Sequence, residues 1–321
     1  MTAWHELILS DAAPDQVWSD IFAALSELAS NTPSPLELHN KTIPPDRLLA
    51  ESAWNVWQAY PTAAPRTSQA LQDWWESASN AGRAVLILDA FSLREMHILL
   101  GAADQREVVA TQIRVTGSEV PSDTNTFAQA LGLPSRARLA SGTPPRGFVL
   151  SSDDIWTDVL NHPFEDAATA FPPKRDVIIW HTWLDDLLHV HERSPDQVTR
   201  TAQQTLQSDG FWKFIDALRQ GRRLMVTADH GYALARSFAT NETDEEVVDA
   251  LKSVFAASRC KPAAAPWTHR LMPPVVFTHN GHHVVMGQRK WRIQGGYPYL
   301  CHGGMSLLEV AVPFVELPRV D

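Results

Sequence analysis

Three short apolar runs, each followed closely by acidic or histidine side chains, limit most strongly what this chain can fold into. The runs are AVLIL at 84–88, VIIW at 177–180 and LMVTA at 224–228. Continuous apolar runs of this length are typical of strands buried in the middle of a sheet. Segments with apolar residues at helical spacing lie between them, at 92–103, 195–207 and 211–221. This alternation predicts an α/β fold with a largely parallel central sheet flanked by helices.

The remaining pattern predicts two parts of the chain. Residues 1–83 form a Trp-rich helical region, which we expect to pack on a core formed by residues 84–321. The tryptophans there have helical spacing, so we expect them to pack a core or interface rather than form a functional aromatic surface. Within the core we also predict a strand at 107–117, a helix at 126–133, a helix at 244–258 and a hairpin about Asn280-Gly281.

Composition excludes several classes of protein. The formal net charge of -10 argues against binding long duplex DNA, which requires clustered basic residues. Two cysteines, Cys260 and Cys301, provide neither a disulfide framework nor a thiolate zinc site, so any zinc must be held by histidine and carboxylate. There is no G-x-S-x-G elbow, P-loop or G-x-G-x-x-G. No run is long enough for a membrane span, and no secretory signal is visible, so we expect a cytoplasmic protein.

Polar residues at the ends of the predicted strands suggest a metal site. Asp89 ends the first run, and Asp229-His230 ends the third. In open α/β sheets the ligand site lies outside the carboxyl ends of the strands, and carboxylate with imidazole is the ligand set of zinc and similar ions. Because adjacent residues on a strand point apart, Asp229 and His230 serve two ions, or one if the loop bends.

Two further segments supply candidates for the same site. Asp185 and His189 are four residues apart, so on a helix they share one face; this spacing favours Asp185 over Asp186. His302 is followed by two glycines that permit close backbone approach. Each candidate alone has a structural explanation, such as a helix cap, a solvated helix face or a hydrogen-bonded histidine. Their ordered recurrence after the predicted strands favours one shared site.

These motifs resemble those of the alkaline phosphatase superfamily. Asp89, DDLLH, ADHG and CHGG occur in its order and rough spacing, and HGGMSLLEVAVP at 302–313 is similar to the closing segment of PglZ domains. VIIWHTWLDDLLH also resembles the PglZ segment around the first metal ligands. PSDTNTFAQAL at 121–131 is similar to the stretch that carries the PglZ threonine nucleophile. The resemblance covers roughly residues 84–317.

The resemblance implies a site with two divalent metal ions, which we expect to be zinc, with manganese as the alternative. One ion would be held by Asp185, His189 and His302, and the other by Asp89, Asp229 and His230 with the Thr124 hydroxyl close to it. The threonine would form a covalent phospho-enzyme that water then releases.

Two positions depart from that pattern or stay open. PglZ domains have an arginine shortly after the first aspartate, where this chain has Ser92, with Arg94 two residues later. Arg94 is therefore a candidate phosphate contact. The nucleophile segment contains three hydroxyls; the Pro-Ser-x-Thr pattern favours Thr124, and Ser122 and Thr126 remain alternatives.

The function implied is a zinc-dependent hydrolase of phosphoesters, a phosphodiesterase acting on nucleotides or short oligonucleotides. The alternative is a non-catalytic metal-binding module of a phage-defence or signalling assembly, with residues 1–83 as the surface that docks protein partners. All six expected ligands can be assigned, which favours an active or at least metal-binding protein. Neither a membrane nor long duplex DNA is an expected partner.

Overall fold

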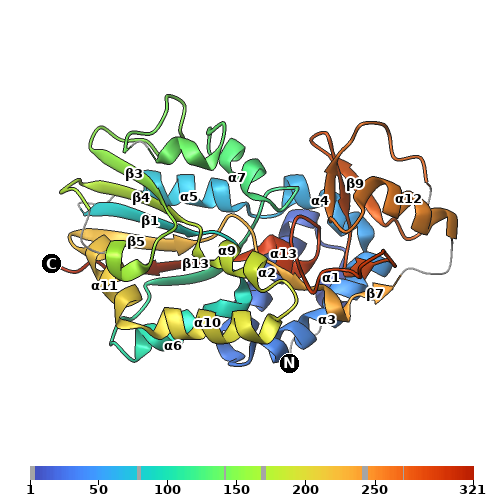
Figure 1. Ribbon diagram of the computed structural model, residues 1–321, viewed down its shortest axis with the longest axis horizontal. Helices are drawn as coiled ribbons and strands as arrows, with labels where there is room; N and C mark the ends of the chain where they lie inside the picture. The colour runs from blue at the N-terminus through green and yellow to red at the C-terminus, as the bar shows by residue number, and fades with distance from the viewer. Residues whose placement is uncertain (1–3, 78–80, 141, 168–170, 241–244, 270) are drawn as a thin grey trace.

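A six-stranded sheet forms the centre of the protein (Figure 1). The computed structural model describes residues 4–77, 81–140, 142–167, 171–240, 245–269 and 271–321. The strand order is β2 (Gln112–Gly117), β13 (Ala311–Leu317), β5 (Arg222–Thr227), β1 (Gly82–Leu88), β4 (Asp176–His181) and β3 (Ile155–Leu160). The pairs β1–β4, β1–β5 and β3–β4 are parallel, and only β13 runs against its neighbours β5 and β2. The predicted α/β fold with a largely parallel sheet is confirmed.

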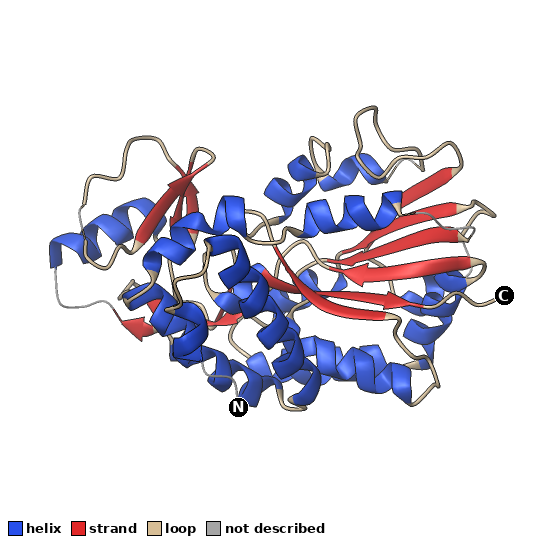
Figure 2. Cartoon of the chain, turned by 180° about the vertical axis from the view of Figure 1, so that it is seen from behind, coloured by secondary structure: helices blue, strands red, loops and turns tan. Residues whose placement is uncertain are grey.

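Helices cover both faces of the sheet, as Figures 1 and 2 show. Side chains of β1 alternate between the faces: Val85 and Ile87 pack with α5 and α7, whereas Leu86 and Leu88 pack with α6, α10 and α11. All four are fully buried. A strand buried on both faces needs apolar residues at every position, which explains the continuous run at 84–88. The helices named are α5 (Thr67–Glu76), α6 (Leu93–Asp104), α7 (Thr124–Ala130), α10 (Pro195–Gln207) and α11 (Asp209–Arg219).

The first part of the chain is helical, as predicted. It contains α1 (Trp4–Ile8), α2 (Pro14–Asn31), α3 (Pro35–Glu51), α4 (Trp54–Ala63) and α5. Trp18 and Trp57 are fully buried with ring centroids 4.9 Å apart, and Trp74 and Trp75 pack on the sheet, so these tryptophans form core rather than an exposed surface. The domain boundary at residue 83 stays a prediction, since α5 packs directly against β1.

The other elements are short or peripheral. They are α8 (Phe164–Ala167), α9 (Trp183–Val190), α12 (Glu245–Phe255), α13 (Leu307–Val310), η1 (Arg136–Leu139), η2 (Ala235–Ser237), β6 (Ala233–Leu234), β7 (Ala239–Thr240), β8 (Cys260–Pro262), β9 (Val276–His279), β10 (His282–Val285), β11 (Arg289–Lys290) and β12 (Leu300–Cys301). None of the helices described is both long and apolar enough to cross a membrane.

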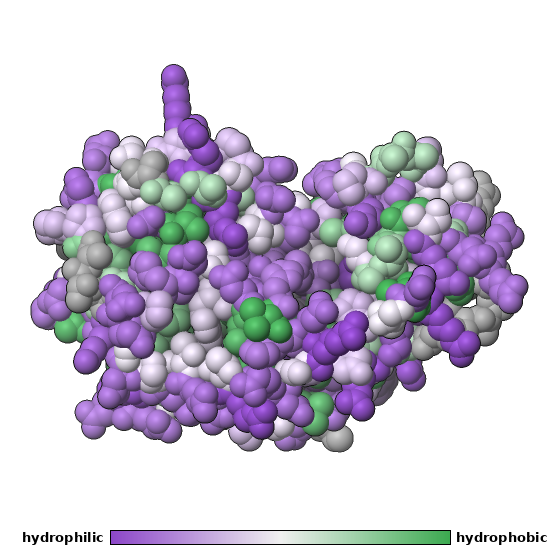
Figure 3. Space-filling view, viewed as in Figure 1, coloured by the Kyte–Doolittle hydropathy of each residue, from purple (hydrophilic) through white to green (hydrophobic). Residues whose placement is uncertain are grey.

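A small lobe formed by α12 and the three-stranded sheet β8–β10–β9 lies at one end of the molecule (Figure 1). Its own apolar cluster is centred on Phe255 and Trp291. Strands β9 and β10 form the predicted hairpin, with positive φ at Asn280 and Gly281 as a type I′ turn requires. Figure 3 shows a notch between this lobe and the main body.

Two element predictions differ from the structure, and one strand of the central sheet was not predicted. The strand predicted at 107–117 begins only at Gln112, and the helix predicted at 126–133 covers Thr124–Ala130 because the Asp123 side chain caps it two residues earlier. Strand β3 was not predicted; it is an edge strand whose mixed burial gives no continuous apolar run.

Candidate metal centre

The carboxyl ends of three neighbouring strands bring the candidate residues together. Asp89 follows β1 directly, Asp229 and His230 come just after β5, and Asp185 lies in the first turn of α9 after β4. Because β1 lies between β5 and β4, these three strand ends are adjacent. This is the place where open parallel sheets bind their ligands.

His302 reaches the same edge by a different route. It lies between β12 and α13, and α13 leads directly into β13. Since β13 is antiparallel to β5, its first residues lie where the parallel strands end. The reversed direction of this one strand therefore places the CHGG segment at the site.

The first group consists of Asp89, Asp229 and His230, whose ligand atoms lie within 4.8 Å of one another. The Nε2 atom of His230 is 3.7 Å from Asp89 Oδ1 and 3.5 Å from Asp229 Oδ2. Its Nδ1 atom lies 3.0 Å from the Gly231 carbonyl, which can only accept, so Nδ1 is the donor in that bond and Nε2 is the ring nitrogen that faces the carboxylates. All three side chains are buried. This is a donor set suited to a divalent cation.

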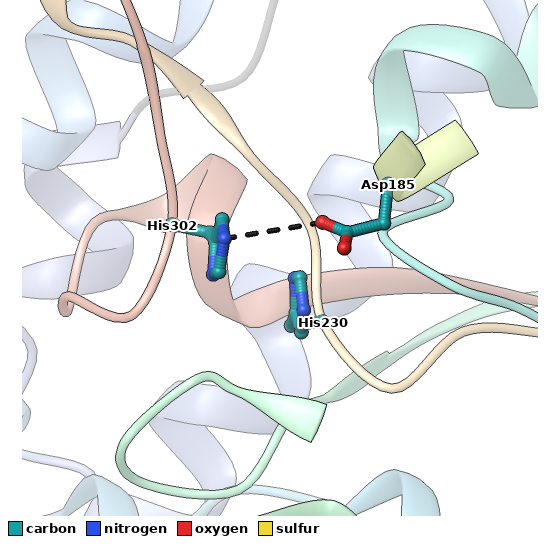
Figure 4. Close-up of side chains that lie close together, drawn as sticks. All are labelled: Asp185, His230 and His302. Carbon is teal, nitrogen blue, oxygen red and sulfur yellow. Dashed lines mark ion pairs between the residues drawn. The ribbon is translucent and has the colours of Figure 1, made fainter. Parts of the chain in front are cut away.

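The second group consists of Asp185, His230 and His302 (Figure 4). His302 Nε2 lies 3.9 Å from Asp185 Oδ1, and the His302 ring stacks on that of His230 with centroids 4.4 Å apart. Desolvation in the site and the nearby His230 imidazole lower the pKa of His302 to about 4, which keeps it in the neutral form that binds metals.

Two buried polar atoms in this group have no hydrogen-bond partner among the described residues. They are Asp185 Oδ1 and His302 Nδ1. A buried carboxylate oxygen without a hydrogen bond costs free energy, and a bound cation removes that cost. The residues present therefore fit a metal ion at this position.

His189 lies beside Asp185 at the rim of the site. The two side chains share one face of α9, as predicted, with His189 Nε2 3.4 Å from Asp185 Oδ2. The His189 side chain is 68% exposed, and its ring centroid is 6.2 Å from that of His302. Geometrically, His230 rather than His189 groups with Asp185 and His302, so His230 lies between the two groups. Asp186 is exposed and accepts a hydrogen bond from Thr182 instead.

Thr124 is the hydroxyl next to the carboxylates. Its Oγ1 donates a hydrogen bond to Asp229 Oδ2 at 2.7 Å and lies 3.4 Å from Asp89 Oδ1. The neighbouring Ser122 is fully buried and has another role: its Oγ donates to the Gly304 carbonyl and accepts from the Gly303 N–H, which ties this segment to the loop that carries His302.

Each carboxylate of the first group is oriented by other parts of the chain. Asp229 Oδ1 accepts a hydrogen bond from the backbone N–H of Ala90, whose φ of 63° is rare for a residue with a Cβ. Asp89 Oδ2 accepts one from the indole of the buried Trp180 at 3.2 Å and forms an ion pair with Arg136 of η1. Sequence reasoning missed Arg136, because no motif surrounds it.

Arg94 lies away from both groups. It is buried on α6, where Glu95 of the same helix accepts a hydrogen bond from the Tyr232 hydroxyl. The Arg94 guanidinium donates to the Tyr232 hydroxyl, the Thr199 hydroxyl and the Pro35 carbonyl. These contacts do not include a residue of either group, and a role for Arg94 in phosphate binding stays a prediction.

A buried ion pair holds the loop of His302. Glu309 accepts two hydrogen bonds from Arg259 at 2.8 Å, and it also accepts from the Gly304 N–H and the Ser306 hydroxyl. A Cβ at Gly304 would lie 2.5 Å from Arg259 Nε, so a larger residue there would displace the guanidinium from Glu309. Gly304, Ser306 and Glu309 of the closing segment are therefore joined with Arg259 in one hydrogen-bonded network.

Arg259→Met is expected to destabilise the fold by about 3–5 kcal/mol, because it leaves the buried Glu309 carboxylate without its charge partner. Chemical denaturation would measure the loss. The double variant Arg259→Met with Glu309→Leu serves as control and should recover part of it, since no unpaired charge remains. A loss below about 1 kcal/mol in the single variant would show that the pair carries little of the loop's stability.

A cavity of about 250 Å³ borders the second group. Apolar and charged side chains share its wall, the charged ones being Asp123, Glu192 and Arg259. The lining includes Leu188, His189, Glu192, Pro298, Leu300 and His302. A small organic group bound there would lie directly beside His302.

The fold and these two carboxylate–histidine groups define an alkaline-phosphatase-like domain. Residues 146–317 match the family described as the BREX system PglZ alkaline phosphatase-like domain. The match covers more than half of the chain, and the chain belongs to the PglZ family. It includes Asp185, Asp229 and His302, whereas Asp89 and Thr124 precede it.

Solved structures with a similar backbone fold include two hydrolases. Murine ectonucleotide pyrophosphatase/phosphodiesterase 5, as an inactive variant with AMP, has a TM-score of 0.43 and 13% identity over 74% of this chain and 88% of its own. Phosphonoacetate hydrolase from Sinorhizobium meliloti, with phosphonoformate, has a TM-score of 0.43 and 14% identity over 75% and 90%. No curated protein sequence matches this chain.

Proposed function

We propose that this chain is a metal-dependent phosphoester hydrolase that uses Thr124 as its nucleophile, and that its activity is that of a phosphodiesterase on nucleotides or short oligonucleotides. The observation that carries the proposal is the position of the Thr124 hydroxyl, 2.7 Å from Asp229 and 3.4 Å from Asp89. A hydroxyl held between two ligand carboxylates is placed to be activated for attack on phosphorus.

Two metal ions are part of the proposal. Asp89, Asp229 and His230 would hold one, and Asp185 and His302, with His189 at the rim, the other. Zinc is favoured by the carboxylate and imidazole donors, with manganese as the alternative. When bound, two such cations supply the positive charge that activates the attacking oxygen and stabilises the leaving oxygen of an in-line displacement.

In the first proposed step, the Thr124 hydroxyl loses its proton and attacks the phosphorus atom of the substrate. Asp229 Oδ2 is the hydrogen-bond acceptor of Thr124 Oγ1 and thus the nearest acceptor for its proton. The new bond joins Oγ1 to phosphorus, and the bond between phosphorus and the leaving oxygen breaks. Water then attacks the phosphothreonine, and inorganic phosphate or a phosphomonoester is released.

The cavity beside His302 supports a diester substrate. Its volume of about 250 Å³ and its apolar residues suit an uncharged organic group on the leaving side. Asp123 and Glu192 also line it, and these carboxylates disfavour a second phosphate there. The net charge of -10 likewise disfavours long duplex DNA.

A second candidate function is a non-catalytic, metal-binding module of a phage-defence or signalling assembly with protein partners. It is favoured by the BREX system in the description of the matched family. The Thr124 hydroxyl beside Asp89 and Asp229 favours the hydrolase instead, because metal binding alone does not require a nucleophile there. The cytoplasmic location stays a prediction.

Metal analysis and two chromogenic esters test the proposal. Purified metal-replete protein is expected to contain about two zinc ions per chain, and chelation should abolish hydrolysis of bis-p-nitrophenyl phosphate until zinc is returned. The diester should be hydrolysed faster than p-nitrophenyl phosphate. Absence of zinc would contradict the metal site, and bound zinc without hydrolysis of either ester would favour the interaction module.

A further inference from the structure

We propose that Arg136 is the residue that binds the phosphoryl group of the substrate. This inference rests on the proposed function and names a catalytic residue that the motifs did not indicate. The ligand class is a tetrahedral phosphate, either the substrate's phosphoester or released inorganic phosphate.

The backbone of Arg136 is held firmly at the edge of the site. It is the first residue of η1, whose last residue, Leu139, is fully buried. The Thr157 hydroxyl on β3 donates a hydrogen bond to the Leu139 carbonyl at 2.8 Å. The short helix is thereby anchored to the sheet, so the arginine is presented from a fixed position.

One carboxylate connects Arg136 to the nucleophile. Arg136 Nη1 forms an ion pair with Asp89 Oδ2, and the other oxygen of that carboxylate lies 3.4 Å from Thr124 Oγ1. A phosphorus atom approached by Oγ1 would carry its non-bridging oxygens within reach of this guanidinium. Planar guanidinium and phosphate match in a two-point hydrogen-bonded pair, which is why arginine is common at phosphate sites.

Orientation of Asp89 does not require Arg136. The indole of fully buried Trp180 already donates a hydrogen bond to Asp89 Oδ2, and the Asp89 N–H bonds the His181 carbonyl at 2.9 Å. Arginine has five N–H donors, and within the described parts of the chain Asp89 is the sole hydrogen-bonding or ion-pair partner of Arg136. The side chain is 29% exposed, so its other donors remain available.

Two other buried arginines have their donors occupied by groups outside the metal centre. The Arg94 guanidinium donates hydrogen bonds to Tyr232, Thr199 and Pro35. The Arg259 guanidinium donates to Glu309 and to two backbone carbonyls. Once Asp89 shares its charge with a bound cation, its hold on Arg136 weakens, and an anionic phosphoryl oxygen becomes the better partner. Arg136 thus supplies the fixed positive charge that the sequence pattern assigned to Arg94.

The test measures binding of inorganic phosphate by calorimetry to the full-length protein with its zinc bound. Arg136→Ala is expected to weaken binding about 10- to 100-fold, as loss of a charge-assisted contact does, and Arg136→Lys should lie between it and the unaltered protein. Zinc content should stay unchanged in both. Arg138→Ala, an exposed arginine on the same short helix, is the matched control and should bind phosphate normally.

Three outcomes would overturn the assignment: phosphate affinity unchanged in Arg136→Ala, phosphate loss only in step with zinc loss, or no phosphate binding by the zinc-loaded unaltered protein. The second would make Arg136 a positioning residue for Asp89. If Arg136→Ala does not fold, Arg136→Lys decides the question, since it keeps a charge beside Asp89. If the protein binds zinc and phosphate but hydrolyses neither ester, the proposed hydrolase function is contradicted, while the assignment of Arg136 as a phosphate-binding residue stands.

Discussion

Replacing Thr124 with alanine is expected to lower kcat for bis-p-nitrophenyl phosphate about 1,000-fold or more, because the variant lacks the oxygen that attacks phosphorus. Zinc content should fall little, since Asp89, Asp229 and His230 remain. The side chain is only partly buried, so the fold should survive. Initial rates at saturating ester, together with zinc analysis of the same preparation, provide the measurement.

Two neighbouring hydroxyls serve as matched controls. Thr126→Ala should retain activity within about twofold, because capping of α7 uses the Thr126 backbone N–H rather than its hydroxyl. Ser122→Ala should lose about 1–3 kcal/mol of stability, because it removes the hydrogen bonds to the backbone of Gly303 and Gly304. Retained activity in Thr124→Ala, paired with full loss in Thr126→Ala, would move the nucleophile to Thr126.

The second large effect is expected at Asp229. Asp229→Ala removes the carboxylate that accepts the Ala90 N–H and the Thr124 hydroxyl, and it leaves His230 and Asp89 as the remainder of the first group. We expect zinc to fall from about two to about one per chain and hydrolysis to fall about 1,000-fold or more. Zinc analysis and ester kinetics on one preparation separate the two effects.

Asp186→Asn is the control for Asp229→Ala. Asp186 is an exposed carboxylate adjacent to a proposed ligand, and its partner is Thr182 rather than the site. It should keep both zinc ions and its rate. Undiminished zinc and activity in Asp229→Ala would exclude Asp229 from the centre and with it the proposed arrangement around Thr124.

Much of the fold and candidate site could be predicted because burial leaves a local signature. A strand covered on both faces, such as β1, must be apolar at each position, and its run ends where the chain reaches polar surroundings. Asp89 and Asp229 come just after such strands, so their shared edge follows from parallel pairing alone. The i,i+4 spacing likewise predicted the common face of Asp185 and His189.

What could not be predicted depends on contacts between distant segments. The pattern of β3 is that of an edge strand with mixed burial, and no local signal marks it as part of the sheet. Arg136 lies in a loop-like stretch, 47 positions from Asp89, and becomes a site residue only because η1 is anchored on β3. The place of Arg94 beside Tyr232 depends in the same way on packing between α6 and the segment after β5.

The sequence by itself determined which side chains are available and the edge of the sheet at which they gather, because hydrophobic periodicity and strand ends are local properties. Only the tertiary structure decided how these side chains are divided between the two candidate metal-binding groups. The antiparallel entry of β13 brings His302 to that edge, and the stacking of His302 on His230 places His230 between both groups. Strand direction and ring stacking are set by long-range packing, which no window of the sequence encodes.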